Sequence, residues 1–462
     1  QYELTINSDH GTPVGAGWYA AGEEVTWSVT SPAEEADGSI YIADPSSGLV
    51  IMDGPKVFQI EWKEDKFSVS GTIRHWNSEA IPDVQISLSG NNLQQANTGQ
   101  DGNYIFSNLR GGNTTVTPKK EQSFENLRIR TIGALDASLV ARHAVGLEVL
   151  SSEQEIAANV SGDEEINSFD ASLIAQFSVG VINGFPSGKF WDFLPSERIY
   201  DTLKEDKNEQ NYAGILLGDV SGNWSISPAF MASKSNLNET SFSFSIENAS
   251  YSNRNVSIPL YFECQDSPVY SLEYSISYNP NNLNYESSRT TSLTEDFYII
   301  DNKKQGQVTV ALYGIGEITQ SGTIAEMIYS FSDLHKVENE IEISISDIRV
   351  NECIVLKNIN RRVEILPETF SLLQNYPNPF NAFTSLHFTI PRNSKNIRTE
   401  LKIYDITGKL IYVLLDDVLA SGSYTVNWDG RDHTGNRVGT GIYFCHLHAG
   451  EFSSAKKMVL VK

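Results

Sequence analysis

The chain has 462 residues, of which 40% are apolar and 20% charged, and its formal net charge is −24 at pH 7. This length predicts about three to five domains, and the acidic balance argues against nucleic acid or an anionic membrane surface as a partner. The sequence contains no run of 18 apolar residues that would predict a membrane span, and its three cysteines are too few for a disulfide framework. Cys264 and Cys353 stand in one predicted domain, and their pairing is left open.

Acidic, Asn-rich loops suit calcium, which prefers hard oxygen ligands. The alternative is a solvated acidic surface that keeps a secreted protein soluble. The chain begins at Gln1, without Met or a signal peptide, and leads directly into a strand-like segment at residues 2–6. This beginning predicts the tail of a longer protein, with removal of a signal peptide as the alternative.

Residues 1–64 are predicted to form strands, because apolar and polar residues alternate at 24–29 and 57–62. The motif Gly17-Trp18-Tyr19, followed by Gly22, resembles the small β repeat found in tandem in bacterial surface proteins. The resemblance implies a first domain over residues 1–64.

Residues 66–119 are predicted to form a second β domain. Strand patterns at 67–73 and 81–88 precede a T-x-x-D-G-x-Y-x-F motif at 98–106, whose Asp101-Gly102 pair suits a hairpin turn. These features resemble the carboxypeptidase regulatory-like, or collagen-adhesin B-type, sandwich. The resemblance implies a spacer or stalk without chemistry of its own.

Residues 123–226 contain an internal repeat, in which the segment 136–147 recurs 34 residues later as 170–181. Each copy begins with an Asp, continues with good helix formers and ends at a glycine. Asp is a favoured N-cap and Gly a favoured residue after a helix, so the pattern predicts two short helices. Their matching apolar positions predict packing about a pseudo-twofold axis.

The segment 159–170 fits a twelve-residue calcium loop. Side-chain oxygens stand at loop positions 1, 3, 5, 9 and 12 and a backbone carbonyl at position 7; these residues are Asn159, Ser161, Asp163, Asn167, Asp170 and Glu165. Two departures are Asn159 at the usually acidic first position and Glu164 where Gly makes the sharp turn. The alternative is a polar turn without metal.

This loop resembles that of type I dockerins. The resemblance implies calcium as the cofactor and a cohesin module as the partner, contacted by helix-start residues such as Ser168 and Phe169. The alternative for Phe169 is a core residue.

The first repeat lacks its own loop, because residues 125–130 offer almost no ligands. Far downstream, Asp219, Ser221 and Asn223 have the spacing of loop positions 1, 3 and 5, while Ile132 and Asp136 have that of positions 8 and 12. Two halves joined in space would make a second calcium site. This hypothesis requires residues 183–217 to wrap round the helix pair, and the alternative is an ordinary turn at 219–224.

Residues 238–365 return to alternating strand patterns and predict a sandwich of eight or nine strands. The motif Val256-x-Ile258-Pro259, the stretch 272–283 and the turn at 321–325 resemble the cohesin-like family. The resemblance implies a jelly-roll sandwich that binds dockerin modules.

Residues 368–462 carry the most specific motifs of the chain: Leu373–Asn381, Val426–Gly430, the glycine-spaced stretch 435–444 and Lys456–Leu460. In this order at the end of a chain they resemble the C-terminal sorting domain of the type IX secretion system, an immunoglobulin-like sandwich. Ala382 stands where many members have a second proline. The resemblance implies export by the type IX machinery and a place outside a Gram-negative-type bacterium, secreted or on its outer-membrane surface.

The sequence therefore predicts a mainly β chain of tandem immunoglobulin-like and cohesin-like sandwiches with one small helical, dockerin-like module. G-x-S-x-G, H-E-x-x-H and phosphate-loop motifs do not occur, so no enzyme is predicted. The predicted function is a non-catalytic extracellular assembly and anchoring region, with cohesin or dockerin partners in cis or in trans. Its further context would be a polysaccharide-degrading domain upstream, and the alternative is an adhesin or stalk with calcium-stiffened spacers.

Overall fold

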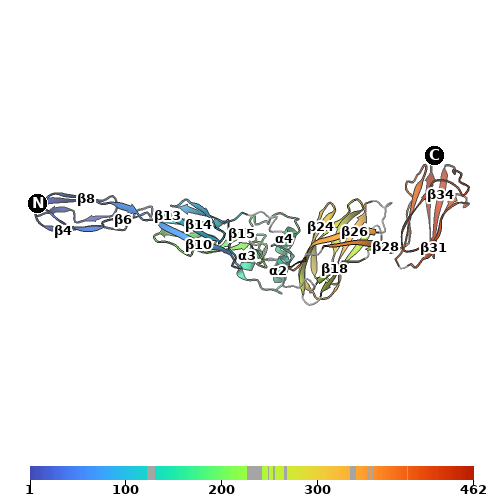
Figure 1. Ribbon diagram of the computed structural model, residues 1–462, viewed down its shortest axis with the longest axis horizontal. Helices are drawn as coiled ribbons and strands as arrows, with labels where there is room; N and C mark the ends of the chain where they lie inside the picture. Colours follow the sequence, from blue (N-terminus) through green and yellow to red (C-terminus); the bar gives the residue numbers. More distant parts are fainter. Residues whose placement is uncertain are drawn as a thin grey trace. The chain divides into compact units, whose positions relative to one another are not determined.

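The computed structural model describes residues 1–121, 131–225, 242–247, 249–252, 255–264, 268–332, 340–351, 353–355, 358–392 and 394–461. The fold is mainly β with a few short helices, which confirms the predicted class (Figure 1). Two compact units are present: unit 1 comprises residues 1–132, 149–170 and 183–232, and unit 2 comprises 133–148, 171–182 and 233–462. No helix in the described part of the chain has the length and apolar character needed to cross a membrane.

The first domain of unit 1 consists of short strands in three small sheets, of orders β3-β1-β8, β2-β4-β7 and β5-β6-β9. The strands are β1 (Tyr2–Asn7), β2 (Pro13–Val14), β3 (Gly17–Tyr19), β4 (Glu24–Val29), β5 (Ala33–Glu34), β6 (Ile40–Ala43), β7 (Ser47–Ile51), β8 (Lys56–Gln59) and β9 (Trp62–Glu64). In β4, Val25, Trp27 and Val29 are buried, as period-two alternation requires.

The second domain of unit 1 is a sandwich of two four-stranded sheets, β13-β10-β17-β15 and β12-β11-β14-β16. Its strands are β10 (Phe67–His75), β11 (Gln85–Gly90), β12 (Gln95–Asn97), β13 (Asn103–Leu109), β14 (Gly112–Lys119), β15 (Trp191–Leu194), β16 (Arg198–Leu203) and β17 (Tyr212–Leu216).

The last three of these strands differ from the prediction, in which residues 183–217 belong to the helical module and wrap round the helix pair. Trp191, Phe193 and Tyr212 are instead buried in the sandwich. β17 pairs in parallel with β10 and β16 antiparallel with β14, so one edge of each predicted sheet is covered. Parallel pairing across more than 130 residues of chain leaves no local sequence signal.

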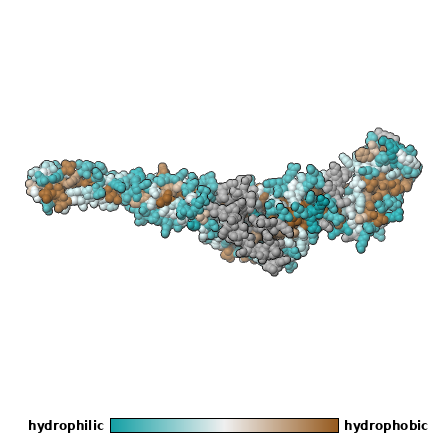
Figure 2. Space-filling model, viewed as in Figure 1, coloured by the Kyte–Doolittle hydropathy of each residue, from teal (hydrophilic) through white to brown (hydrophobic). Residues whose placement is uncertain are grey.

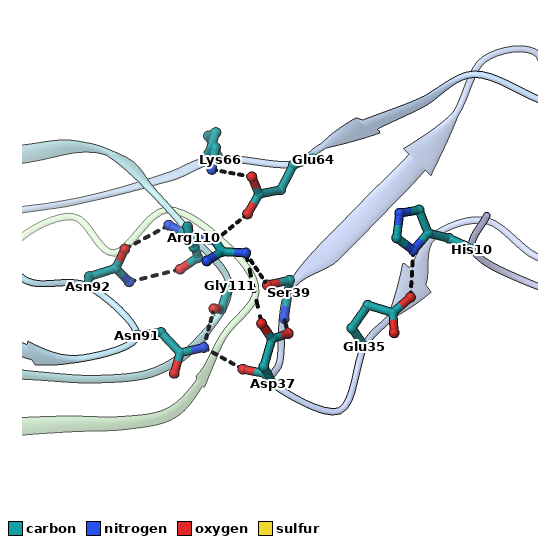
Figure 3. Close-up of polar contacts among 10 residues, drawn as sticks. All are labelled: His10, Glu35, Asp37, Ser39, Glu64, Lys66, Asn91, Asn92, Arg110 and Gly111. Carbon is teal, nitrogen blue, oxygen red and sulfur yellow. Dashed lines mark hydrogen bonds and ion pairs between the residues drawn. The ribbon is translucent and has the colours of Figure 1, made fainter.

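A polar joint connects the two domains of unit 1 (Figure 3). Arg110 stands between β13 and β14, and its Nε lies 2.6 Å from Glu64 Oε1. Its Nη2 donates to Ser39 Oγ at 3.2 Å and lies 3.9 Å from Asp37 Oδ2. The Asn91 amide donates to the Asp37 carbonyl and, at 3.1 Å, to the Gly111 carbonyl.

Glycines allow the two backbones of this joint to touch. A Cβ on Gly38 would lie 2.4 Å from Gly112 Cα, and both glycines have positive φ. Lys66 and then Arg110 hold the pKa of Glu64 below its usual value by hydrogen bonding, against the opposing effect of burial. Charged side chains and the contact between two glycine backbones, rather than an apolar core, therefore set the geometry of the joint.

Three helices are described: α2 (Ala134–Ala144), α3 (Ser152–Ala158) and α4 (Ser168–Ser178). α2 and α4 are the two helices that the repeat predicts. α3 was not predicted; its N-cap is Ser151, whose hydroxyl accepts the Gln154 N–H, and the Gln154 side chain accepts the Ser151 N–H in return.

Within the described residues, the large sandwich of unit 2 has eleven strands, whereas the sequence predicted eight or nine. They are β18 (Phe242–Ile246), β19 (Ala249–Ser252), β20 (Asn255–Cys264), β21 (Val269–Tyr278), β22 (Leu283–Arg289), β23 (Phe297–Lys304), β24 (Gln307–Ile318), β25 (Gly322–Phe331), β26 (Glu340–Val350), β27 (Cys353–Val355) and β28 (Ile359–Pro367). The strand order is β22-β25-β20-β19-β28-β26-β21-β24-β23. Leu272, Tyr274 and Ile276 of β21 point into its apolar core.

The C-terminal strands of unit 2 form a second, smaller sandwich with sheets β29-β30-β33 and β32-β31-β34-β35. They are β29 (Ser371–Leu372), β30 (Thr384–Ile390), β31 (Ile397–Asp405), β32 (Leu410–Leu419), β33 (Gly422–Trp428), β34 (Gly441–Ala449) and β35 (Phe452–Leu460). Trp428 fills its core. Apolar residues also show on its surface (Figure 2). Leu410 and Val418 of β32 are among the exposed large apolar residues.

Parts of the sequence-based hypotheses fall outside the described residues. These are the ligand-poor segment 125–130, the chain between the helical module and the large sandwich at 226–241, and the side chain of Cys264. The pairing of Cys264 with Cys353 therefore stays open.

Candidate calcium loop and helix–sheet interface

The predicted calcium loop brings its side-chain oxygens together. Ser161 Oγ donates to Asp163 Oδ1 at 2.9 Å and lies 3.4 Å from Asn159 Oδ1. The backbone N–H of Ser161 donates to Asp170 Oδ1 at 2.9 Å. Loop positions 1, 3, 5 and 12 therefore enclose one small volume.

The backbone of the loop makes the turn that such a loop needs. Gly162 has φ +79° and Glu164 has φ +71°, so Glu164 adopts the left-handed conformation usually given to Gly at loop position 6. The Glu165 N–H donates to Asp163 Oδ1 at 3.2 Å, and the Glu165 side chain is exposed. Glu165 would thus offer its carbonyl at position 7.

Asp170 is fully buried, and its role at the helix start differs from the prediction. α4 begins two residues earlier, so Asn167 is the N-cap and accepts the Phe169 N–H at 2.8 Å. Asp170 is the third helical residue and accepts the Asn167 N–H at 3.2 Å, which is one of the two hydrogen bonds of a capping box. No described Lys, Arg or His forms an ion pair with this buried carboxylate.

The loop residues fit a calcium ion by the chemistry of their donors, which are all hard oxygens. Only Asp163 and Asp170 among them bring negative side-chain charge, and no group of three or more Asp, Glu, His or Cys side chains gathers in the described chain. Neutral Asn and Ser ligands predict weaker binding than an all-acidic loop.

The two halves of the proposed second site lie in different units. Asp136 in unit 2 accepts the Gly133 N–H at 2.8 Å, and so occupies the same third helical position as Asp170. Asp219 in unit 1 accepts the N–H groups of Asn223 and Trp224 at 2.9 and 3.0 Å. Their meeting in one metal site stays a prediction.

The surroundings of Asp219 contain features that the sequence does not show. His75 Nε2 lies 3.4 Å from Asp219 Oδ2, and both side chains are fully buried. Ser221 Oγ lies 3.4 Å from Asp219 Oδ1, whereas the buried Asn223 Oδ1 accepts no hydrogen bond within the described chain. A protonated His75 would oppose a cation here, and the Asn223 oxygen would favour one.

Ser168 and Phe169, the predicted partner-contacting residues, are exposed, and 53% of the Phe169 surface is accessible. Phe169 is therefore not a core residue. The helix contacts seen in unit 2 involve other residues, beginning with the small side chains of α2.

Helix α2 packs on strands β21 and β24 of the large sandwich. Its buried residues Ala134, Ala137, Ser138 and Ala141 recur at the spacing of one helix face. Small side chains along this face let the helix backbone approach the sheet closely. Ser271 and Glu273, on the outer face of β21, are also buried.

The N-terminus of α2 is bound by a carboxylate of the sheet. Glu273 Oε1 accepts the Ala134 N–H at 2.7 Å, and Glu273 Oε2 lies 3.2 Å from Arg349 Nη1. The first N–H groups of a helix lack intrahelical partners and carry partial positive charge, so a carboxylate suits this position. Arg349 holds the carboxylate from its other side.

Two further side chains of α2 donate hydrogen bonds to backbone carbonyls of β24. Ser138 Oγ donates to the Gly314 carbonyl at 2.6 Å, and Arg142 Nη1 donates to the Ile315 carbonyl at 3.0 Å. The Arg142 guanidinium also lies over the Tyr270 ring, 4.9 Å from its centre. The helix is thus fixed at its start, middle and end.

The second repeat contacts the same sheet through the equivalent position. Ser172 is the counterpart of Ser138, and its hydroxyl hydrogen-bonds the side chain of Tyr313, next to Gly314; burial raises the pKa of this tyrosine. Beyond the end of α4, Asn302 Nδ2 donates to the Val179 carbonyl at 2.9 Å. The internal repeat therefore presents one serine from each copy to adjacent residues of β24.

Sequence reasoning missed the sheet half of this interface. Glu273 is the one acidic residue in the alternating stretch 270–278, at a position that alternation assigns to solvent. Nothing in the sequence marks the Gly314 and Ile315 carbonyls, because backbone acceptors carry no residue signature. The serines at equal positions of the repeat were the available signal.

Comparison with known protein families matches residues 381–450 to the FlgD Ig-like domain, within the predicted sorting domain. No curated protein matches the chain. Similar solved structures include the sixth cohesin of scaffoldin B from Acetivibrio cellulolyticus, with 18% identity, a TM-score of 0.24, and coverage of 27% of this chain and 98% of the cohesin.

A cohesin module of a family 33 glycoside hydrolase from Clostridium perfringens has 15% identity and a TM-score of 0.23, covering 28% of this chain and 96% of its own. A non-cellulosomal cohesin from the archaeon Archaeoglobus fulgidus has 18% identity and a TM-score of 0.23, covering 27% of this chain and 91% of its own. Similarity at this level assigns no function.

Proposed function

We propose that this chain is the non-catalytic, extracellular assembly and anchoring region of a secreted cell-surface protein. The observation that carries the proposal is the helix–sheet interface of unit 2. A helix from the dockerin-like repeat is held by the cohesin-like sandwich through its N-terminus, one serine and one arginine. Specific polar contacts around a close-packed helix face are typical of protein–protein recognition.

Calcium is the proposed cofactor of the loop 159–170. Asn159, Ser161, Asp163, Asn167 and Asp170 would hold it with side-chain oxygens, and Glu165 with its carbonyl. The ion would supply positive charge between carboxylates and so stiffen the turn into α4. Two carboxylates and several neutral ligands suggest a dissociation constant of about 10⁻⁴–10⁻³ M, the range of extracellular modules.

The C-terminal domain is proposed to direct export by the type IX machinery and attachment to the outer surface. The immunoglobulin-like match over 381–450 supports the fold of such a domain. The test is a periplasmic reporter fused to residues 373–462 in a host that has this secretion system. Surface or extracellular reporter supports the proposal, and a reporter that stays periplasmic contradicts it.

A second candidate is a structural stalk, and the polar joint of unit 1 favours it. Arg110, Asn91 and the close approach of Gly38 to Gly112 fix one domain against the next, which is useful in a spacer. Binding of the chain to isolated cohesin modules in calcium, through the exposed residues Ser168 and Phe169 and not through the occupied helix face, would support assembly with outside partners. Absence of binding, with surface display intact, would support the stalk.

A further inference from the structure

We propose that the helix-binding face of the large sandwich is closed in cis by the chain's own helices, and that the partner it fits when opened is the helix pair of a second copy. The inference rests on the proposed function, because it treats the helix–sheet contact as an association interface. It adds that the interface is self-occupied and names its occupant.

The face is built to recognise features that the repeat supplies. The Glu273 carboxylate can accept a hydrogen bond from an N–H group at the start of a helix. The Gly314 and Ile315 carbonyls can accept hydrogen bonds from two side-chain donors that lie one helical turn apart. Ala134, Ser138 and Arg142 provide these donors, four residues apart along one helix. A helix from another copy carries the same three groups and therefore fits equally well.

Occupancy in cis explains the burial of this face. Only 8% of the Glu273 surface is accessible, and Ser271 beside it is buried, although both stand on the outer side of β21. A tethered helix acts at an effective concentration in the millimolar range. A free helix at micromolar concentration competes poorly with it, so the intact chain should remain monomeric.

The closed state can be opened from either side within the full chain. Ser138→Arg places a bulky charge on the helix face and leaves the sheet face intact. Glu273→Arg puts a second cation next to Arg349 and the helix N-terminus, and leaves the helices intact. Neither variant can close in cis or pair with itself. The helices of the Glu273→Arg chain can, however, dock on the free sheet face of the Ser138→Arg chain.

Light scattering after gel filtration measures the expected complementation. Wild type and each variant alone should have the mass of one chain, and an equimolar mixture of the variants should give a species of twice that mass. A wild-type dimer, or a mixture of folded variants that stays monomeric, would overturn the proposal. Surface display of the reporter fusion is independent of either outcome, so the proposed anchoring function stands or fails separately.

A milder pair guards against misfolding of the first two variants. Arg142→Glu on the helix and Tyr270→Ala on the sheet change side chains that are only partly buried. Circular dichroism and exchange protection of β21 amides establish that each variant is folded. A 1:1 heterodimer from this second pair supports the inference, and monomers from both pairs reject it.

Discussion

The joint of unit 1 and the helix–sheet interface of unit 2 connect segments in opposite ways. The joint relies on charged side chains that are partly exposed, such as Arg110, and on glycine backbones in contact. The interface buries a stripe of small residues of α2 and adds three polar contacts within it. Water solvates exposed charges well when they are apart, so the ion pairs of the joint orient the two domains but add little stability. A buried polar group of the interface that loses its partner, in contrast, lowers stability strongly.

The comparison predicts that the largest effect of a single substitution lies in the interface. Glu273→Ala leaves the Arg349 guanidinium and the Ala134 N–H at the start of α2 without this acceptor in a nearly dry site. We expect a loss of about 2–3 kcal/mol in the stability of the docked helix. Hydrogen exchange of α2 amides in increasing urea measures this loss.

The matched control is Glu342→Ala, which removes an exposed glutamate of β26 in the same sandwich. Exchange in α2 should not change in this control. Equal effects of the two substitutions would show that the burial of Glu273 has no energetic consequence, and the contrast between joint and interface would fail.

The sequence predicted the local features of this interface but not its assembly. Strict alternation in 270–278 places Leu272 and Tyr274 in the core and Glu273 outside, and the structure agrees. Alternation cannot tell that a helix covers the outer side, because that contact joins residues about 140 positions apart. The same limit hid the parallel pairing of β17 with β10.

At the calcium loop, chain-local signals were more informative. The spacing of Asn159, Ser161, Asp163 and Asp170 predicted that their oxygens converge, because the loop closes on itself within twelve residues. The N-cap was predicted three residues too late, at Asp170 instead of Asn167. Both Asp170 and the true N-cap, Asn167, are favourable near a helix N-terminus, and the composition alone does not choose between them.

The loop is polar like the joint but has a buried carboxylate like the interface, so an intermediate effect is expected. Asp170→Ala removes the acceptor of the Ser161 and Asn167 N–H groups, and this loss of hydrogen bonds should cost about 1 kcal/mol even without metal. In calcium the cost should be greater, because the variant also loses a ligand. Thermal unfolding with calcium and with excess chelator measures both parts.

Asp163→Ala serves as the comparison, since it removes a ligand at an exposed position that does not cap the helix. It should lower stability in calcium and have little effect in chelator. A wild-type melting temperature that does not change in excess chelator would contradict a metal role for the loop.

Glu164→Gly sharpens the same comparison with a smaller effect of opposite sign. The left-handed backbone at φ +71° costs a non-glycine residue about 1 kcal/mol, and glycine relieves this strain. The added freedom of glycine in the unfolded chain offsets about half of the gain, so we expect a net stabilisation of about 0.5 kcal/mol. Gly162→Ala, at φ +79°, should destabilise the loop, and a stabilising Gly162→Ala would contradict this account of the turn.

The smallest effect is expected at the polar joint and should depend on pH. The folded-state pKa of Glu64 is lowered by hydrogen bonds from Lys66 and Arg110, so its contribution is complete above the unfolded pKa. The contribution is lost as pH falls through the folded pKa, that is, below about pH 4.3. The Asp65 N–H, which donates to the Ile40 carbonyl at 2.8 Å beside Glu64, reports on the joint by hydrogen exchange.

Its protection, corrected for the intrinsic effect of pH, should decrease in the wild type between about pH 4.5 and 3. In Arg110→Gln the protection should be lower and should depend less on pH, because Glu64 loses its partner across the joint and keeps only Lys66, which lies two residues away. High salt should reduce the difference between the two proteins by screening the partly exposed pair. Amides of α2 should show no such dependence on Arg110, since the interface of unit 2 is held by buried contacts. A joint that keeps its protection in acid and salt would owe its stiffness to the contact of Gly38 with Gly112 instead, and Gly38→Ala would then have the greater effect.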